Sequence, residues 1–97
     1  MERRKTVHIR DILQNFWREN PELYHKMMEV RIQRLWGEVF GPSITQYTTR
    51  LFVKKRVLYV SMSSSVVRNE LISMRKGLVK TLNEHAGGDV IDDVVIR

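Results

Sequence analysis

The sequence predicts a small α+β domain with the order helix-helix-strand-strand-helix-strand and a small three-stranded sheet packed on helices. Three observations support this fold class. A chain of 97 residues has room for a single hydrophobic core. The N-terminal part repeats its apolar side chains with the period of a helix, and the segment after residue 46 alternates them as a strand does. Helices and strands that are segregated in this way are typical of helices layered on one face of a sheet.

The N-terminal part predicts a basic tail at residues 1–6, followed by a single domain at residues 7–97 that opens with two helices. The first helix runs from about Val7 to Arg18, because its apolar residues share one helical face. Asn20 is expected to cap the second helix, with Pro21 at its first position. Gly41 and the proline after it are expected to end that helix. Trp36 and Val39 are expected to pack against the sheet and the third helix. The full apolar side of this second helix comprises Leu23, Tyr24, Met27, Met28, Ile32, Leu35, Trp36 and Val39.

Two strands follow, at residues 47–53 and at about 58–62. The second strand places Leu58, Val60 and Met62 on one face. The short connection at residues 54–56 makes the two strands antiparallel neighbours. Its sequence, Lys-Lys-Arg, lacks the glycine that tight hairpins prefer, so the type of turn stays open.

The C-terminal part predicts one long helix and a last strand. The serines at 63–65 offer an N-cap, and Gly87-Gly88 ends the helix. The last strand lies within residues 90–96 and pairs with the first or the second strand, with Val94 and Ile96 on one face. One apolar stripe of the long helix is expected to face the sheet, namely Val67, Leu71, Met74, Leu78 and Leu82.

Composition excludes several classes of protein. The chain has no cysteine, which excludes disulfide frameworks, thiol nucleophiles and thiolate metal sites. No apolar run approaches the length of a membrane span, and no apolar segment follows the basic N-terminus as in a signal peptide. We therefore expect a cytoplasmic protein.

Catalytic motifs are also missing from the sequence. It contains no phosphate-binding glycine loop and no nucleophile elbow. The histidines, His8, His25 and His85, lie on three different predicted elements without metal-ligand spacing. We therefore predict a protein that is not an enzyme and that needs no cofactor and no metal.

The positive charge is concentrated in the middle of the chain. The formal net charge is +6, and residues 50–80 carry eight basic side chains against one acidic one, a net of +7. Such a block suggests a polyanionic partner, either nucleic acid or an acidic protein surface. The candidate nucleic-acid-binding residues are Arg50, Lys54, Lys55 and Arg56 at the hairpin, Arg68, Arg75, Lys76 and Lys80 on the long helix, and Phe52.

Aromatic residues add two hypotheses. Phe52 and Arg50 share a strand face by parity, so they point outward together if Leu51 and Val53 face the core. If they do not, Phe52 covers a helix instead. Tryptophan on an apolar helical stripe is usually a core residue, but an exposed one can anchor a protein partner. Trp17 and Trp36 are therefore both candidates for partner binding.

Several short motifs follow one another along the chain, in the order Trp36-Gly37-Glu38-Val39-Phe40-Gly41, Ile44, Thr48, Leu58-Tyr59-Val60, Ser64, Glu70-Leu71 and Leu82-Asn83. This order resembles that of the bacterial DciA family, whose best known members load the replicative DNA helicase. The resemblance covers about residues 9–97, with Val67 where relatives usually carry a second tryptophan.

This resemblance implies a K-homology-like fold and a role in helicase loading, with the replicative helicase and DNA as partners. The function expected is thus a non-enzymatic nucleic-acid-binding adaptor. Its DNA binding is expected to be weak and tolerant of sequence, on single or double strands. The alternative is a protein-interaction module whose basic face meets an acidic protein and no nucleic acid.

Overall fold

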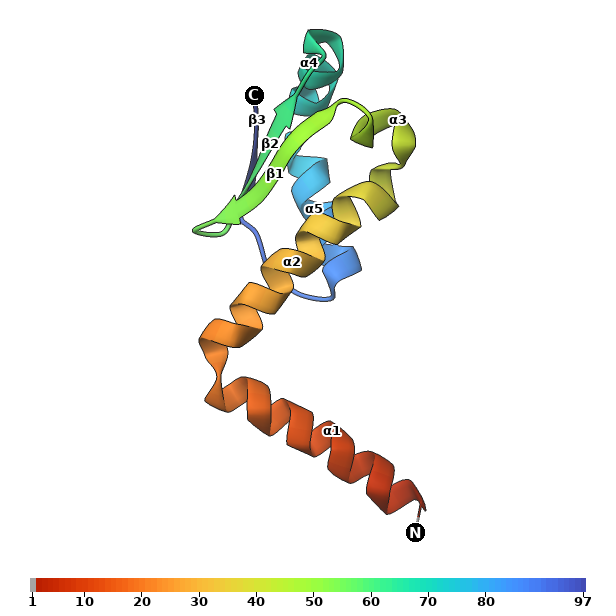
Figure 1. The fold of residues 1–97 in the computed structure, drawn as a ribbon, viewed down its shortest axis with the longest axis vertical. Coiled ribbons are helices and arrows are strands. Elements are labelled where there is room, and N and C mark those ends of the chain that lie inside the picture. The colour runs from red at the N-terminus through yellow and green to blue at the C-terminus, as the bar shows by residue number, and fades with distance from the viewer. Residues whose placement is uncertain (1) are drawn as a thin grey trace.

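The computed structural model describes the backbone of residues 2–97 and the side chains from residue 9 onward. It confirms the predicted α+β class and the order of elements (Figure 1). The sheet is mixed: β1 pairs antiparallel with β2, and β2 pairs parallel with β3. The elements are α1 (Glu2–Glu19), α2 (Pro21–Phe40), α3 (Pro42–Thr45), β1 (Thr48–Lys54), β2 (Val57–Met62), α4 (Ser65–Ser73), α5 (Arg75–Ala86) and β3 (Asp93–Ile96).

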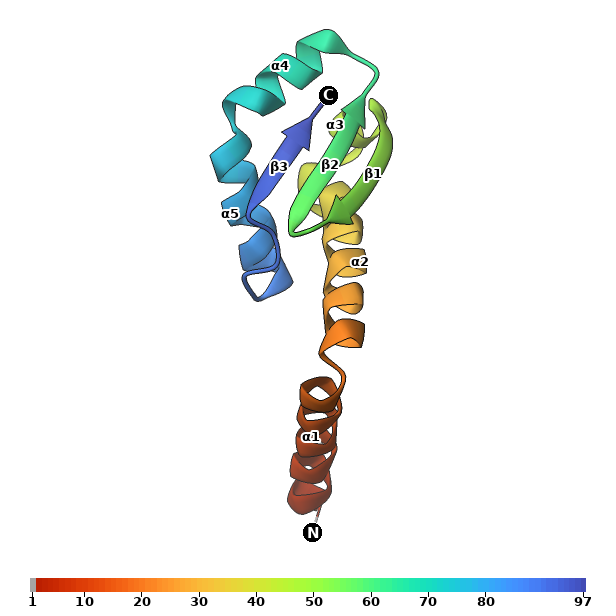
Figure 2. The same cartoon turned by 90° about the vertical axis from the view of Figure 1, so that its left-hand side faces the viewer.

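The core lies between one face of the sheet and the helices α2 and α5 (Figures 1 and 2). Strand alternation supplies the sheet side of this core, because Leu58 and Val60 of β2 and Val94 of β3 are fully buried. Trp36 of α2 is 1% exposed, as expected of a residue on the apolar side of the helix. Its indole Nε1 donates to Thr48 Oγ1 at 3.1 Å, which ties α2 to the start of β1.

The caps of the helices follow the sequence in three of four cases, since Gly41 ends α2 as predicted, at φ 75°. Ser64 accepts a hydrogen bond from the amide of Val67 and begins α4, and Gly87 ends α5 in the left-handed region at φ 81°. Asn20 precedes Pro21 as expected, but its side chain does not cap α2. Its Nδ2 donates instead to the carbonyl of Phe16 at 2.8 Å, so it closes the end of α1.

The predicted long third helix is wrong, since the structure divides it at Met74 into α4 and α5. Ser73 Oγ donates to the carbonyl of Glu70 at 2.7 Å, and a serine that bonds to the backbone in this way competes with the helical ladder. Met74 is 51% exposed rather than part of the apolar stripe, whereas Leu71, Leu78 and Leu82 are buried as predicted.

Two further boundaries differ from the prediction. Helix α1 begins at Glu2, before the expected start at Val7, so it includes residues assigned to a tail. After Gly41 ends α2, Pro42 begins the short helix α3, which the sequence did not predict, because proline fits the first turn of a helix. Helix α1 points away from the body of the domain, and the molecule is therefore elongated, with extents of 57 × 25 × 20 Å (Figure 2).

Candidate nucleic-acid interface

Within residues 2–97, no helix covers the face of the sheet opposite α2 and α5 (Figures 1 and 2). In β2 and β3, buried residues alternate with partly exposed ones, so the partly exposed set points to this open face. Phe52, Tyr59 and Val95 lie opposite one another on the three strands and form a row across it. Leu51 and Val53 pack against the core, which confirms that Phe52 and Arg50 point outward together.

Two arginines and two aromatic rings on this face form an ordered stack. The rings of Phe52 and Tyr59 are parallel within 10°, with centroids 4.9 Å apart. The Arg50 guanidinium lies over Phe52 at 4.9 Å, and that of Arg97 lies over Tyr59 at 5.2 Å. Because each ring has its partner ring on one side, each guanidinium covers the other side. We call Arg50, Phe52, Tyr59 and Arg97 the Arg–aromatic ladder.

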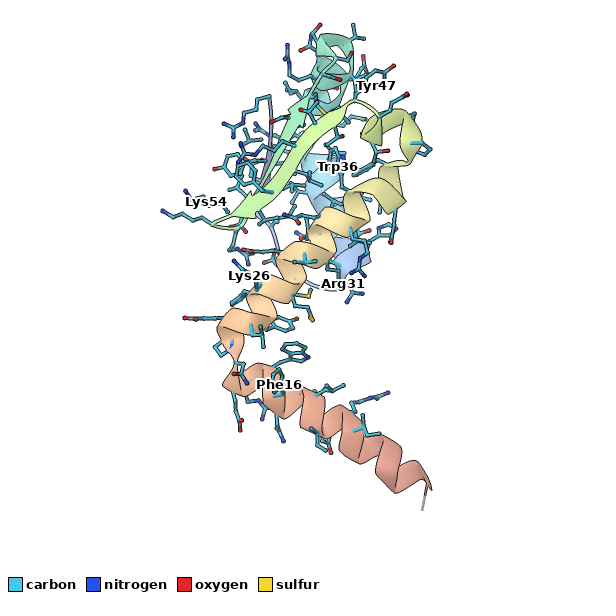
Figure 3. The ribbon with its side chains drawn as sticks, in the orientation of Figure 1. Phe16, Lys26, Arg31, Trp36, Tyr47 and Lys54 are labelled. Carbon is cyan, nitrogen blue, oxygen red and sulfur yellow. The ribbon has the colours of Figure 1, made fainter. Side chains whose placement is uncertain are left out.

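The hairpin between β1 and β2 has Lys54 and Lys55 at its tip, and Figure 3 shows Lys54 pointing away from the body of the domain. Lys55 and Arg56 both have positive φ, 50° and 64°, as the two central residues of a type I′ turn require. The left-handed backbone conformation costs a residue other than glycine about 1–2 kcal/mol, so the turn is strained. The side chains of Lys54 and Lys55 are exposed and form no salt bridge among the described residues.

Arg56 does not belong to this free set of cations. Its Nε and Nη2 donate to the two carboxylate oxygens of Asp92 at 3.0 and 2.9 Å, and its Nη1 donates to the Asp89 carbonyl. The hydrogen bond to Asp92 raises the pKa of Arg56, and the same bond lowers the pKa of Asp92. The sequence predicts that Arg56 contacts nucleic acid. In the structure, its guanidinium is already paired with Asp89 and Asp92.

The predicted cations of the long helix lie away from the hairpin tip. Helix α4, which carries Arg68, lies at the opposite end of the sheet (Figures 1 and 2). At the start of α5, Arg75 pairs with Asp93 of β3 at 3.3 Å, while Lys76 is exposed. Lys80 approaches Glu84 at 4.0 Å, one turn further along the same helix. The structure therefore separates the predicted cations into a hairpin group and a helix group.

Sequence reasoning missed Arg97 and gave Tyr59 no place among the site residues. Strand parity is the signal that could have found both. Arg97 alternates with the buried Ile96, and Tyr59 with the buried Leu58 and Val60. The missing information was that β3 pairs with β2, because this pairing brings Arg97 next to Tyr59.

The two tryptophans have different surroundings. Trp36 is enclosed in the core and has no surface to offer a partner. Trp17 is half-buried where α1 meets α2, in edge-to-face contact with Phe16 and with Tyr24 at centroid distances of 5.1 and 5.7 Å. Of the two predicted partner anchors, only Trp17 is within reach of another molecule.

Other chemistry finds little support in the part of the chain that the structure describes. No cluster of three or more histidine or acidic side chains there could hold a metal ion. His85 Nδ1 lies 2.9 Å from the carbonyl of Thr81 in its own helix. None of the described helices is both long and apolar enough to cross a membrane.

A family model described as "Dna[CI] antecedent, DciA" matches residues 8–96, nearly the whole chain. The resemblance inferred from the motifs between Trp36 and Asn83 is thereby confirmed. No curated protein matches the chain.

Proposed function

The chain belongs to the DciA family of helicase loader-type replication proteins, and on this basis we propose that it is a non-enzymatic adaptor that binds nucleic acid while it engages the replicative helicase. Family membership supports the helicase as the protein partner. The Arg–aromatic ladder on the open sheet face is the observation that supports nucleic acid as the second partner.

The ladder suits a nucleic acid because each end is a guanidinium that lies over an aromatic ring. A guanidinium plane stacks on a base and donates to phosphate oxygens with its remaining N–H groups. Contact with the rings beneath them restrains the side chains of Arg50 and Arg97, so less side-chain entropy is lost on binding. Bases would then stack on the outer faces of the two arginines, as in sequence-tolerant binding of single strands.

The hairpin tip extends this surface with point charges. Lys54 follows Phe52 on the same strand face, and Lys55 is next to it in the turn. Lysines contact phosphates without reading bases, so they add affinity that is independent of sequence. The proposed site thus combines two stacking cations, Arg50 and Arg97, with two phosphate-binding lysines.

Fluorescence anisotropy with a labelled single strand of mixed sequence, and with the matched duplex, tests this proposal at low salt. In Arg50→Gln/Arg97→Gln, we expect affinity for the single strand to fall about tenfold or more, since stacking contributes about 1–3 kcal/mol per base. The control, Arg31→Gln/Arg34→Gln, removes the same charge from exposed positions on α2. Its affinity should change by less than about threefold.

Equal losses in the two double variants would show that net charge alone attracts the strand, and the ladder would not be the site. Absence of binding by the unmodified protein would contradict the nucleic-acid half of the proposal. The basic face would then serve an acidic protein surface, and the replicative helicase would be the first partner to test.

A further inference from the structure

An apolar surface on α1 and the start of α2 is left exposed by the side chains that the structure describes, from residue 9 onward. Its members recur at helical spacing on α1 and again on α2, and each is between 36% and 64% exposed. None of them contributes to the core, which α2 reaches through Met28, Ile32 and Trp36 instead. We call this surface the elbow stripe; it consists of Ile9, Ile12, Leu13, Phe16, Leu23, Met27 and Val30.

Figure 3 shows the elbow between α1 and α2, with Phe16 labelled on α1. Helical geometry places the two halves of the elbow stripe on the same side of this elbow. Trp17 and Tyr24 face each other inside the elbow. Phe16 and Leu23 each precede one of these residues by one position, which is a rotation of about 100° about the helix axis. Because the chain runs in one direction through the elbow, the same rotation directs both side chains to the same side.

The size of the elbow stripe is that of a protein interface. From the exposed fractions of its members, it presents roughly 600–800 Å² of largely apolar surface per chain. Monomeric proteins rarely expose a contiguous apolar patch above a few hundred Å². A standard interface buries about 800 Å² on each partner, so two such surfaces are sufficient for a stable dimer.

The chain cannot cover the elbow stripe by itself. Asn20 is the only residue between α1 and α2, whereas two antiparallel helices need a connection of about 2–5 residues. The contacts of Trp17 with Phe16 and Tyr24 also hold the elbow open. A connection too short for closure within one chain favours exchange of the helix between two chains.

We propose that the elbow stripe is the interface of a two-fold homodimer, in which α1 of each copy lies antiparallel on α2 of the other. The spacing along the chain supports this arrangement. Leu13 and Met27 each lie seven residues from Asn20, and Ile9 and Val30 lie eleven and ten residues from it. A two-fold axis that bisects the elbow therefore places apolar residues of α1 opposite apolar residues of the partner's α2.

Disulfide trapping tests the dimer directly, because the chain contains no cysteine. Leu13→Cys and Met27→Cys are prepared as separate proteins, mixed in equal amounts and oxidised. We expect a covalent dimer that contains one copy of each, while each protein oxidised alone stays a monomer on the gel. The control replaces Met27→Cys with Val66→Cys on α4, a more exposed position (72% against 36%) that should nevertheless not form the mixed disulfide.

Sedimentation velocity of the unmodified protein supplies the second readout. We expect twice the mass of the chain at micromolar concentrations, and a monomer for Leu13→Asp but not for Val66→Asp. Two further variants keep the result interpretable if Leu13→Asp unfolds α1: Phe16→Ser and Val30→Ser should each weaken the dimer without a negative charge. The proposal would be overturned if the protein were a monomer at every concentration and formed no mixed disulfide. This would hold even if a different protein were then found to cover the elbow stripe.

Discussion

Arg56 and Asp92 form a bidentate ion pair that joins the tip of the β1–β2 hairpin to the segment before β3, with N–O distances of 3.0 and 2.9 Å. The backbone repeats this connection, since the amide of Asp92 donates to the carbonyl of Arg56 at 2.7 Å. Asp89 adds a second carboxylate at 3.1 Å. These contacts fix the left-handed backbone of Arg56, which a non-glycine residue adopts only at a cost.

Loss of Asp92 should therefore loosen the hairpin tip before it affects the core. We expect Asp92→Asn to lower the unfolding midpoint and to speed the hydrogen exchange of the amides near residue 56. A bidentate charge-assisted pair is stronger than a neutral hydrogen bond. Asp11→Asn on α1, the matched control, should leave both measurements unchanged. An unchanged exchange rate at the hairpin in Asp92→Asn would contradict this role.

The same pair should make stability depend on acidity. The folded-state pKa of Asp92 is lowered by Arg56, so its contribution is fully present above the unfolded-state pKa of about 4. That contribution is lost as the pH falls through the depressed folded-state pKa. Urea midpoints of the unmodified protein and of Asp92→Asn should therefore converge below about pH 4. A constant difference down to the acid limit would contradict this linkage.

Trp36 should be the most sensitive position of the core. Trp36→Ala leaves a large cavity between α2 and the sheet and should cost about 3–5 kcal/mol of stability. Trp36→Phe removes the hydrogen bond to Thr48 but keeps an aromatic ring, and should cost about 1–3 kcal/mol. Trp17→Ala at the elbow is the control, and chemical denaturation monitored by circular dichroism compares all three. Normal stability of Trp36→Ala would contradict a core role.

Met74 should tolerate change because it lies at a break rather than in the core. Met74→Gln should alter stability by less than about 0.5 kcal/mol, whereas Leu78→Ala should cost about 2–5 kcal/mol. Met74 is 51% exposed and Leu78 is 3% exposed. Equal costs at the two positions would mean that a continuous helix, as predicted from the sequence, forms in solution.

The local pattern of apolar residues in the sequence was sufficient to predict most of the fold. Helical period predicted Met28, Ile32 and Trp36 in the core, and strand parity predicted Val94 and Ile96, because each signal depends on neighbouring residues alone. The break at Met74 escaped this reasoning. Met74 continues the apolar spacing, and only the hydrogen bond between Ser73 and Glu70 shows why the helix stops there.

The site was harder to predict, because it depends on contacts between distant segments. The sequence indicated Arg50 and Phe52 from parity within one strand. The role of Arg97 requires β3 to lie beside β2, and the engagement of Arg56 requires residues 89–92 to reach the hairpin. The net charge of residues 50–80 counts Arg56 as a cation that is free to bind nucleic acid. The structure shows that Arg56 is paired with Asp89 and Asp92.

Salt dependence gives the sharpest separation between the ladder and the hairpin lysines. Four unpaired cations, Arg50, Lys54, Lys55 and Arg97, would release about 0.7 counterions each from a single strand, which predicts a slope of log K against log[salt] near −3. Over a fourfold rise in salt, affinity should then fall by roughly twentyfold to a hundredfold. Anisotropy titrations at several salt concentrations measure this slope.

The variants should change the slope and the affinity in different ways. Lys54→Gln/Lys55→Gln removes two phosphate contacts and should flatten the slope by about 1.4 units, equally on all sequences. Phe52→Leu/Tyr59→Leu keeps every charge but removes the support beneath both guanidiniums, so it should lower affinity at each salt concentration and leave the slope near −3. Arg56→Gln is the control among the cations, because its acidic partners already neutralise it and its loss should flatten the slope by less than about 0.3 units. A slope change in Arg56→Gln as large as that of one lysine would show that the ion pair with Asp92 opens on binding, and the hairpin tip would then belong to the interface as a whole.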